Sequence, residues 1–483
     1  MSFFNVQKPE NPTNGQEMIS MSKPNNKDKE SLIYFLDETA NDYDSYDDYY
    51  DKLPPDIVYK VTKRILKAEH LLVVDGIIWR YDMETGAFYK MEHDQTEMFI
   101  ESFYTKAEYR IAKSGLAKEI KTRICRQVDL QENAKNFNAQ TEYINCANGV
   151  IQIGKNYCRL KKHDPKYKFT YCIDAKFLEK KFKMPTFKNL SQTSLNGDKK
   201  SKKLLLEIIG YSCSDLTSAK KAFFFKGEPD SGKSVLLRFI ERLVGIHNVS
   251  HIPLHELDRR FNKIELFTKK LNTSGEMKNI ALPDISCLKA YTGGDMISAE
   301  YKHGRHIDYY PTAKLIFAGN ALPLSAEDEA TKAFINRVCL LIFPRSIAKE
   351  DQNPDLGDDL WNERNAIFTA AVNTLPKLIA KKFKFTEPEN SLSYLRYYEN
   401  TANSLDMFLT DCCVFDPNAS IPVKEFQTSY KAYCDQNVLE IIGRTNMNSR
   451  LLEKHKIARN KVHRKDSNVY HYIGIRFRNT KIE

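Results

Sequence analysis

The chain has 483 residues, with 73 Lys and Arg against 63 Asp and Glu, and a formal net charge of +10. At roughly 150 residues per domain this length predicts about three domains and excludes a single small module. Hydrophobic residues make up 42% and charged residues 28%. These values are typical of soluble proteins, no run approaches the roughly 20 apolar residues of a membrane span, and the basic excess is compatible with a polyanionic partner.

The ten cysteines contain no C-x-x-C pair, and the first residues lack a charged region followed by a long apolar stretch. The first pattern argues against structural zinc of the common spacing, and the second against a secretory signal. We therefore expect reduced thiols, a cytoplasmic protein and no membrane partner.

Residues 1–55 are rich in Asn, Pro, Ser, Asp and Tyr, and the acidic run at 42–51 has neither helical nor strand periodicity. This composition predicts an acidic, largely disordered tail. An alternative is an internal phosphate mimic that competes for a basic surface elsewhere in the chain.

Residues 56–195 combine a helical pattern at 57–68 with a strand, turn and strand pattern at 71–81. This mixture predicts a small α+β domain. The lysine-rich polar segment at 188–203 predicts a linker, and the alternating apolar strands and helices of residues 196–400 predict an α/β domain.

The strongest chemical signal in this α/β domain follows a buried strand pattern at 221–225 and precedes an amphipathic helix that ends at Gly245. It matches G-x-x-x-x-G-K-[ST] with Gly227, Glu228, Pro229, Asp230, Ser231, Gly232, Lys233 and Ser234. In such a loop backbone N–H groups surround phosphates, the lysine reaches the β- and γ-phosphates, and the hydroxyl of Ser234 ligates Mg²⁺. The motif therefore predicts a site for ATP and Mg²⁺.

Three polar residues downstream are candidates for the chemistry. Glu276 follows a strand pattern and could orient water, although the neighbouring position that usually carries a second acid is Gly275. Asn320 ends an apolar strand pattern and could contact the γ-phosphate, and Arg337 precedes another core strand. The alternatives are a surface glutamate, an asparagine turn and a structural arginine.

A basic and aromatic segment lies between Glu276 and Asn320. It begins at the T-G-G-D sequence of residues 292–295 and contains Lys302 and His303. The pattern predicts a hairpin, with a solvated loop as the alternative.

In this order, the motifs resemble those of superfamily 3 helicases, and more narrowly the helicase part of phage, plasmid and poxvirus primase-helicases. The resemblance covers about 200 residues, and the overall layout is similar to replication initiators of staphylococcal pathogenicity islands and cassette elements. It implies an AAA+ core that follows a collar domain and assembles into a ring, with a hexamer as the expected form.

The resemblance also implies roles for the candidate residues. Glu276 would activate water, Asn320 would act as a sensor, and Arg337 would be an arginine finger inserted into a neighbouring subunit. Lys302 and His303 would lie on a pore hairpin that grips the DNA backbone.

The last block, residues 401–483, carries much of the basic excess, with 13 Lys and Arg against 6 Asp and Glu from residue 424 onward. Helical patterns at 426–437 and 446–455 precede strand patterns at 456–464 and 469–477, the layout of a winged helix. Leu451 and Leu452 are expected on the core side of the second helix. The expected DNA contacts are Arg450, Lys454, Lys461 and Arg464. A packing domain with a basic surface is the alternative.

Together these patterns predict a multidomain α/β protein with an α+β collar, an AAA+ superfamily 3 core and a C-terminal winged helix. The expected function is an ATP-dependent DNA helicase and replication initiator of a mobile genetic element, which binds double- and single-stranded origin DNA. A separate primase and host replication proteins are expected partners. The alternatives are an ATP-switched origin-melting protein without processive unwinding, and a small-molecule kinase.

Overall fold

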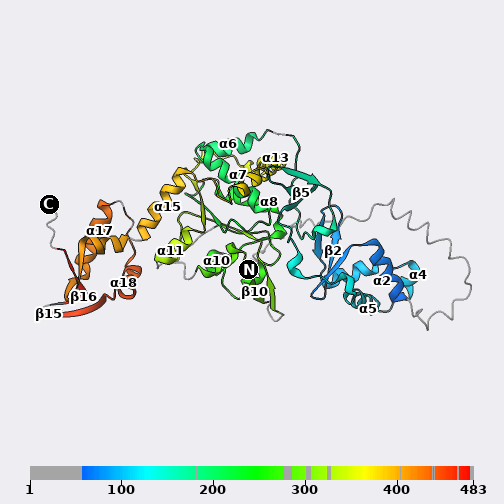
Figure 1. Ribbon diagram of the computed structural model, residues 1–483, viewed down its shortest axis with the longest axis horizontal. Helices are drawn as coiled ribbons and strands as arrows, with labels where there is room; N and C mark the ends of the chain where they lie inside the picture. Colours follow the sequence, from blue (N-terminus) through cyan, green and yellow to red (C-terminus); the bar gives the residue numbers. More distant parts are fainter. Residues whose placement is uncertain are drawn as a thin grey trace, which may run out of the picture.

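The computed structural model describes residues 57–180, 183–275, 285–300, 306–323, 328–402, 404–437, 439, 441–464 and 467–478. Figure 1 shows an N-terminal block, a central block around a parallel sheet, and a C-terminal block that follows helix α15. The tail predicted at 1–55 lies outside the described residues. Within the described part of the chain, every helix is too short or too polar to cross a bilayer.

The first part of the N-terminal block has a three-stranded antiparallel sheet and four helices. The elements are α2 (Ile57–Ala68), β1 (Leu71–Val74), β2 (Ile77–Asp82), β3 (Ala87–Lys90), α3 (His93–Glu101), α4 (Lys106–Ile111) and α5 (Leu116–Cys125). Val61 and Ile65, one turn apart on α2, share a buried core with Ile120 and Ile124 of α5. The predicted helix and the predicted strand, turn and strand are confirmed.

A second antiparallel sheet follows, with β4 (Tyr143–Cys146), β5 (Gly149–Ile153) and β6 (Cys158–Lys161). Helices α6 (Pro185–Thr193) and α7 (Lys199–Cys213) come next, so the predicted linker at 188–203 is wrong. Asp198 caps α7 by accepting the N–H groups of Lys200 and Ser201. The first turn of α7 is polar and therefore resembles a linker in the sequence, whereas the following turns have a buried apolar face formed by Leu204, Leu205, Ile208 and Ile209.

The central block is built on a five-stranded parallel sheet in the order β13-β7-β12-β9-β8. Its strands are β7 (Ala222–Gly227), β8 (Val249–Ser250), β9 (Leu271–Ser274), β12 (Lys314–Gly319) and β13 (Val338–Phe343). Phe223 and Phe225 join the core on one face and Phe224 joins the core on the other. Both faces of the sheet are therefore covered, as a parallel sheet requires, and the predicted α/β organisation is confirmed.

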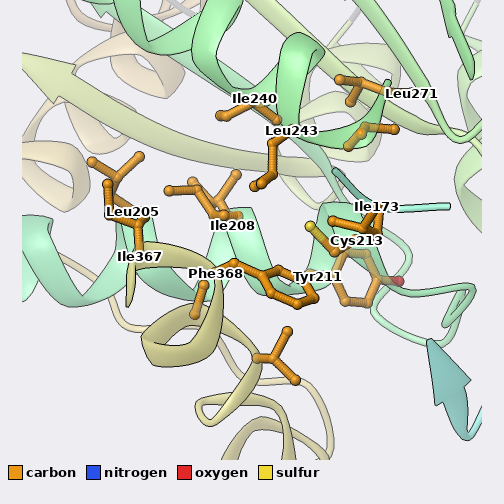
Figure 2. Packing of buried hydrophobic residues seen from close by; sticks show 14 of the residues in the cluster. Ile173, Leu205, Ile208, Tyr211, Cys213, Ile240, Leu243, Leu271, Ile367 and Phe368 are labelled. Atoms are coloured by element: carbon orange, nitrogen blue, oxygen red, sulfur yellow. The ribbon is translucent and has the colours of Figure 1, made fainter. Parts of the chain in front are cut away.

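The helices and the hairpin of the central block complete both cores. They are α8 (Lys233–Val244), α9 (Asn262–Glu265), α10 (Ser286–Gly293), β10 (Ile297–Glu300), β11 (His306–Tyr309), α11 (Asp328–Ile335), α12 (Leu356–Asn362), α13 (Arg364–Val372) and α14 (Leu375–Ala380). Short 3-10 turns lie at Val128–Leu130, Ala134–Asn136, Pro165–Tyr167, Ile246–Asn248, Leu254–Glu256 and Lys349–Asp351. Figure 2 shows Ile208 of α7, Leu243 of α8 and Phe368 of α13 packed together.

The larger of these two cores crosses the predicted boundary at residues 195/196. It contains Ile144 and Val150 of the second small sheet, Phe187 of α6, and Phe225 and Leu341 of the parallel sheet. The segment from β4 to α6 therefore packs as one body with the parallel sheet, whereas α2 to α5 have a core of their own.

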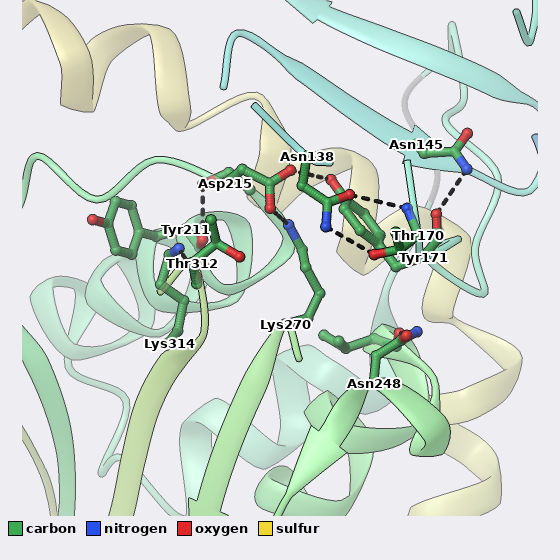
Figure 3. Close-up of polar contacts among 12 residues, drawn as sticks. Asn138, Asn145, Thr170, Tyr171, Tyr211, Asp215, Asn248, Lys270, Thr312 and Lys314 are labelled. Atoms are coloured by element: carbon green, nitrogen blue, oxygen red, sulfur yellow. Dashed lines mark hydrogen bonds and ion pairs between the residues drawn. The ribbon is translucent and has the colours of Figure 1, made fainter. Parts of the chain in front are cut away.

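A buried polar network lies at the amino edge of the parallel sheet (Figure 3). Lys270, directly before β9, forms an ion pair of 2.5 Å with Asp215, and both side chains are fully buried. The Tyr171 hydroxyl donates to Asp215 at 2.7 Å, and the Lys270 ammonium lies 3.8 Å from the centre of the Tyr171 ring. The network therefore ties the connection after the second small sheet to the parallel sheet.

The C-terminal block begins after α15 (Glu389–Ala402), whose Tyr398 belongs to the core of the central block. The elements of this block are α16 (Ser404–Cys412), β14 (Cys413–Pro422), α17 (Val423–Gln436), α18 (Arg444–Glu453), β15 (Ala458–Arg464) and β16 (Ser467–Phe477). The strands form an antiparallel sheet in the order β14-β16-β15 around a separate core. The predicted helices and strands at 426–477 are confirmed, and α16 and β14 are additional.

Candidate functional site

The phosphate loop connects β7 to α8 and needs glycine at two positions. A Cβ atom on Gly227 would lie 2.4 Å from the carbonyl oxygen of Phe343, and one on Gly232 would lie 2.6 Å from the Ser194 hydroxyl. Gly232 also has a φ of +92°, which a larger residue rarely adopts. The loop is therefore held closely between β13 and the end of α6.

Lys233, the first residue of α8, is 8% exposed and points back into the loop. Its ammonium donates to the carbonyl oxygens of Gly227 and Glu228, both at 2.6 Å, and to the Ser231 hydroxyl at 3.0 Å. Burial lowers the pKa of Lys233, while the nearby carboxylates of Glu228 and Asp230 oppose this effect. The positive charge therefore lies inside the concave side of the loop, where an anion would interact with it.

Ser234 follows Lys233 in the first turn of α8, and its side chain is exposed. The first N–H groups of a helix have no partner inside the helix and favour bound anions. An exposed hydroxyl beside these groups fits a ligand for Mg²⁺ that is shared with a phosphate. The residues present therefore fit a nucleoside triphosphate and Mg²⁺.

A pocket of about 910 Å³ extends from the loop across the carboxyl edge of the parallel sheet. It is lined by Lys233 and Ser234, by Gly275 after β9, and by Gly319 and Asn320 at the end of β12. Parallel strands place their carboxyl ends at one edge, which brings these residues together. The structure thus places Asn320 at the phosphate loop, as expected from the sequence. Glu276 lies outside the described residues, directly after Gly275.

Two further segments that the motifs did not indicate complete the pocket. One is α6, and the other runs from 347 to 359 after β13. The N–H of Ile347 donates to the carbonyl oxygen of Asp230 at 2.9 Å, and the hydroxyl of the preceding Ser346 donates to the carbonyl oxygen of Pro229 at 2.7 Å. The beginning of the second segment therefore braces the backbone of the loop. Backbone contacts leave no residue pattern in a sequence; the proline at the first position of α6 was the one available signal of a helix there.

Arg337 lies at the opposite edge of the sheet from the phosphate loop. Its carbonyl oxygen accepts the N–H of Ala222 at 2.8 Å, at the beginning of β7. The six residues of β7 separate the two edges by about 20 Å, at roughly 3.3 Å per residue. Arg337 is half-buried, and this separation places it far from the phosphate loop of the same chain.

The predicted hairpin is confirmed in its two strands, because Ile297 pairs with Tyr309 and Glu300 pairs with His306. Lys302 and His303, the expected DNA contacts, lie between these strands and outside the described residues. Their placement therefore stays a prediction.

The expected DNA contacts of the C-terminal block differ in their surroundings. Arg450 is half-buried on α18, Lys461 is exposed on β15, and Arg464 pairs with Ser467 across the β15–β16 hairpin. The ammonium of Lys454 lies 2.6 Å from the carboxylate of Asp406, so its charge is already compensated within the block.

One expectation about α18 is wrong. Leu452 is 55% exposed, and the buried side of the helix is formed by Met447 and Leu451. These two residues are four positions apart and therefore share one face, whereas Leu452 is rotated by about 100° from Leu451.

Two protein families match parts of the chain. Residues 58–195 match the family described as "D5 N terminal like", and residues 225–337 match a "Family of unknown function (DUF5906)". The second match begins in β7 and includes the phosphate loop, Asn320 and Arg337. No curated protein matches the chain.

Solved structures of an NrS-1 C-terminal region are similar in outline. "The A form apo structure of NrS-1 C terminal region-CTR" is 11% identical, covering 88% of this chain and 100% of that chain, with a TM-score of 0.48. The A form of residues 305–718 is 14% identical, covering 86% and 98%, with a TM-score of 0.45. The match to the family described as "D5 N terminal like" covers residues 58–195, less than a third of the chain, and concerns that segment alone.

Proposed function

We propose that the protein is an ATP-dependent DNA helicase and replication initiator of a mobile genetic element. The observation that carries this proposal is one pocket in which the phosphate loop meets the ends of β9 and β12. Lys233 and the first turn of α8 would bind the phosphates of ATP. Ser234 would hold Mg²⁺, which offsets negative charge on the phosphates, and Glu276 and Asn320 would orient the attacking water.

The order of elements in the C-terminal block supports DNA binding. Two helices, α17 and α18, follow strand β14 and precede the β15–β16 hairpin, which is the order of elements expected of a winged helix. In this arrangement α18 would enter a major groove with Arg450, and the hairpin would place Lys461 and Arg464 on phosphates. The salt contact of Lys454 with Asp406 favours a structural role for that lysine.

The position of Arg337 supports action as a ring. Since it lies at the far edge of the sheet from its own phosphate loop, an arginine finger at this position would have to act on a neighbouring subunit. We propose a hexamer in which the β10–β11 hairpins carry Lys302 and His303 toward single-stranded DNA. A separate primase and host replication proteins complete this proposal as partners.

A strand-displacement assay with Lys233→Ala tests the function. We expect the variant to lose ATP hydrolysis by about 100-fold or more, because it lacks the buried charge of the loop, and to lose unwinding with it. Duplex binding should persist, since the proposed DNA-reading residues lie in a block with a separate core. Lys200→Ala, an exposed change in the first turn of α7, is the matched control and should behave as wild type.

Unwinding by Lys233→Ala at the wild-type rate would contradict the assignment of the site. ATP hydrolysis by the wild-type protein without strand displacement would favour the alternative, an ATP-switched protein that binds and melts an origin.

A further inference from the structure

The candidate pocket is larger than a phosphate site requires, and its second half combines apolar and polar side chains. Beyond the loop it is lined by Pro185 and Leu190 of α6 on one side and by Ile347 and Leu356 on the other. Pockets that bind organic ligands are mostly apolar with a few placed polar groups. The apolar side chains of these two segments offer a surface for a flat aromatic ring, which inorganic phosphate does not have.

Two amide side chains of this half are already used within the protein. The Asn353 carboxamide accepts the N–H of Asp355 at 3.0 Å and donates to Asp359 at 2.9 Å. Gln352 donates to the carbonyl oxygen of Ile347 at 3.0 Å. These contacts hold the segment 347–359 in shape and occupy the amide nitrogens of both side chains.

Asn189 differs from these amides. It lines the pocket from α6, its side chain is exposed, and within the described part of the chain its carboxamide has no hydrogen-bond partner. A carboxamide offers one acceptor and one donor side by side. It can therefore pair with a ligand edge that presents a donor next to an acceptor.

Helix α6 holds Asn189 at a fixed place relative to the phosphate loop. Glu363 accepts the N–H groups of Thr186 at 2.7 Å and Phe187 at 3.0 Å, which anchors the beginning of the helix. Phe187 and Leu190 are buried in the large core, and Ser194 after the helix packs against Gly232 of the loop. A side chain on such a rigid element can select between ligands.

We propose that α6 and the segment 347–359 form a nucleobase subsite in which Asn189 selects adenine over guanine. The N6 amino group and N7 of adenine present a donor beside an acceptor, which the carboxamide matches with two hydrogen bonds. Guanine presents two acceptors, O6 and N7, at the same edge. The carboxamide can donate to only one of them and leaves its own oxygen without a partner. This proposal rests on the proposed function, because it assumes that the phosphates of the nucleotide bind to the phosphate loop.

Competition binding on the full chain tests this assignment, with a fluorescent ATP analogue displaced by ATP or by GTP. Wild-type protein should prefer ATP. We expect Asn189→Asp to reduce the ATP-over-GTP preference by about 10-fold, because a carboxylate lacks the donor for N7, and Asn189→Ala should weaken ATP more than GTP. Lys188→Ala, a change at the neighbouring exposed position that does not line the pocket, should leave the preference unchanged.

The outcomes separate this inference from the proposed function. Equal affinity of the wild type for ATP and GTP, or an unchanged preference in Asn189→Asp with binding intact, would overturn the base-selecting role. If the wild-type protein bound neither nucleotide, the proposed function itself would be contradicted. Thermal melting of each variant shows whether it remains folded. If Asn189→Asp does not fold, the nucleotide preference of Asn189→Ala tests the proposal instead.

Discussion

Lys314, the first residue of β12, is a lysine buried in the interior of the protein. It is 4% exposed, and its ammonium donates to the carbonyl oxygen of Thr312 at 2.5 Å (Figure 3). Burial, with a smaller effect of the neighbouring Lys270, lowers the pKa of Lys314 from 10.5 to about 7, and Asp215 opposes the shift. Near neutral pH the folded protein therefore holds this proton less firmly than the unfolded chain does.

This difference makes the stability depend on pH. Between about pH 7 and about pH 10 the unfolded chain binds the extra proton, so the free energy of unfolding should rise with pH by up to about 1.4 kcal/mol per unit. Lys314→Met removes the titrating group. We expect this variant to be more stable than wild type at pH 7, with an advantage that shrinks by pH 9, as measured by denaturant unfolding. Lys200→Met, at an exposed site, should show no such trend, and a constant advantage of Lys314→Met would contradict the buried, neutral lysine.

At the scale of elements, α18 and the β15–β16 hairpin should have different effects on DNA binding. Arg450 lies on the helix proposed for the major groove, whereas Lys461 is exposed on the hairpin proposed for the phosphates. We expect Arg450→Ala to reduce discrimination between origin and random duplex, since base contacts carry sequence information. Lys461→Ala should weaken binding to both duplexes similarly. It should also reduce the dependence of the affinity on salt concentration by about the share of one phosphate contact.

Competition binding at two salt concentrations measures both effects. Lys431→Ala, at an exposed position on α17, is the matched control and should change neither quantity. An Arg450→Ala protein with unchanged origin preference would assign the reading of bases to another element.

The elements also show what the sequence can predict. The phosphate loop, α8 and the strands around Asn320 follow from local patterns, because a glycine motif and continuous apolar runs act over a few residues. The wall formed by α6 does not, because it depends on Glu363, 177 residues away from Thr186, and on backbone contacts of Ile347. Strand β14 has an exposed polar centre that breaks the alternation a strand prediction needs.

At the scale of the whole molecule, the sheet separates Arg337 from the phosphate loop of the same chain. We expect Arg337→Ala to bind nucleotide but to hydrolyse it about 1,000-fold more slowly, since an arginine finger contributes in this range. Mixing Arg337→Ala with Lys233→Ala should partly restore ATP hydrolysis, because an interface between the two variants can combine an intact loop with an intact arginine.

The mixing ratio provides the control for this prediction. Restored activity should reach a maximum at intermediate ratios, and each variant alone should remain inactive. If mixed assemblies are confirmed by mass measurement and no activity returns, Arg337 has a structural role within its own subunit.

The continuous core across residues 195/196 limits how this protein can have exchanged parts with its relatives. A recombination event at that boundary would join an α6 from one lineage to a phosphate loop from another. The close contact between Ser194 and Gly232 would then be formed by residues that come from different parents. Exchange before β4 or after α15 leaves each hydrophobic core within one parent. We therefore expect the C-terminal block to have been replaced freely during evolution, while the segment from β4 to α15 was inherited as one piece.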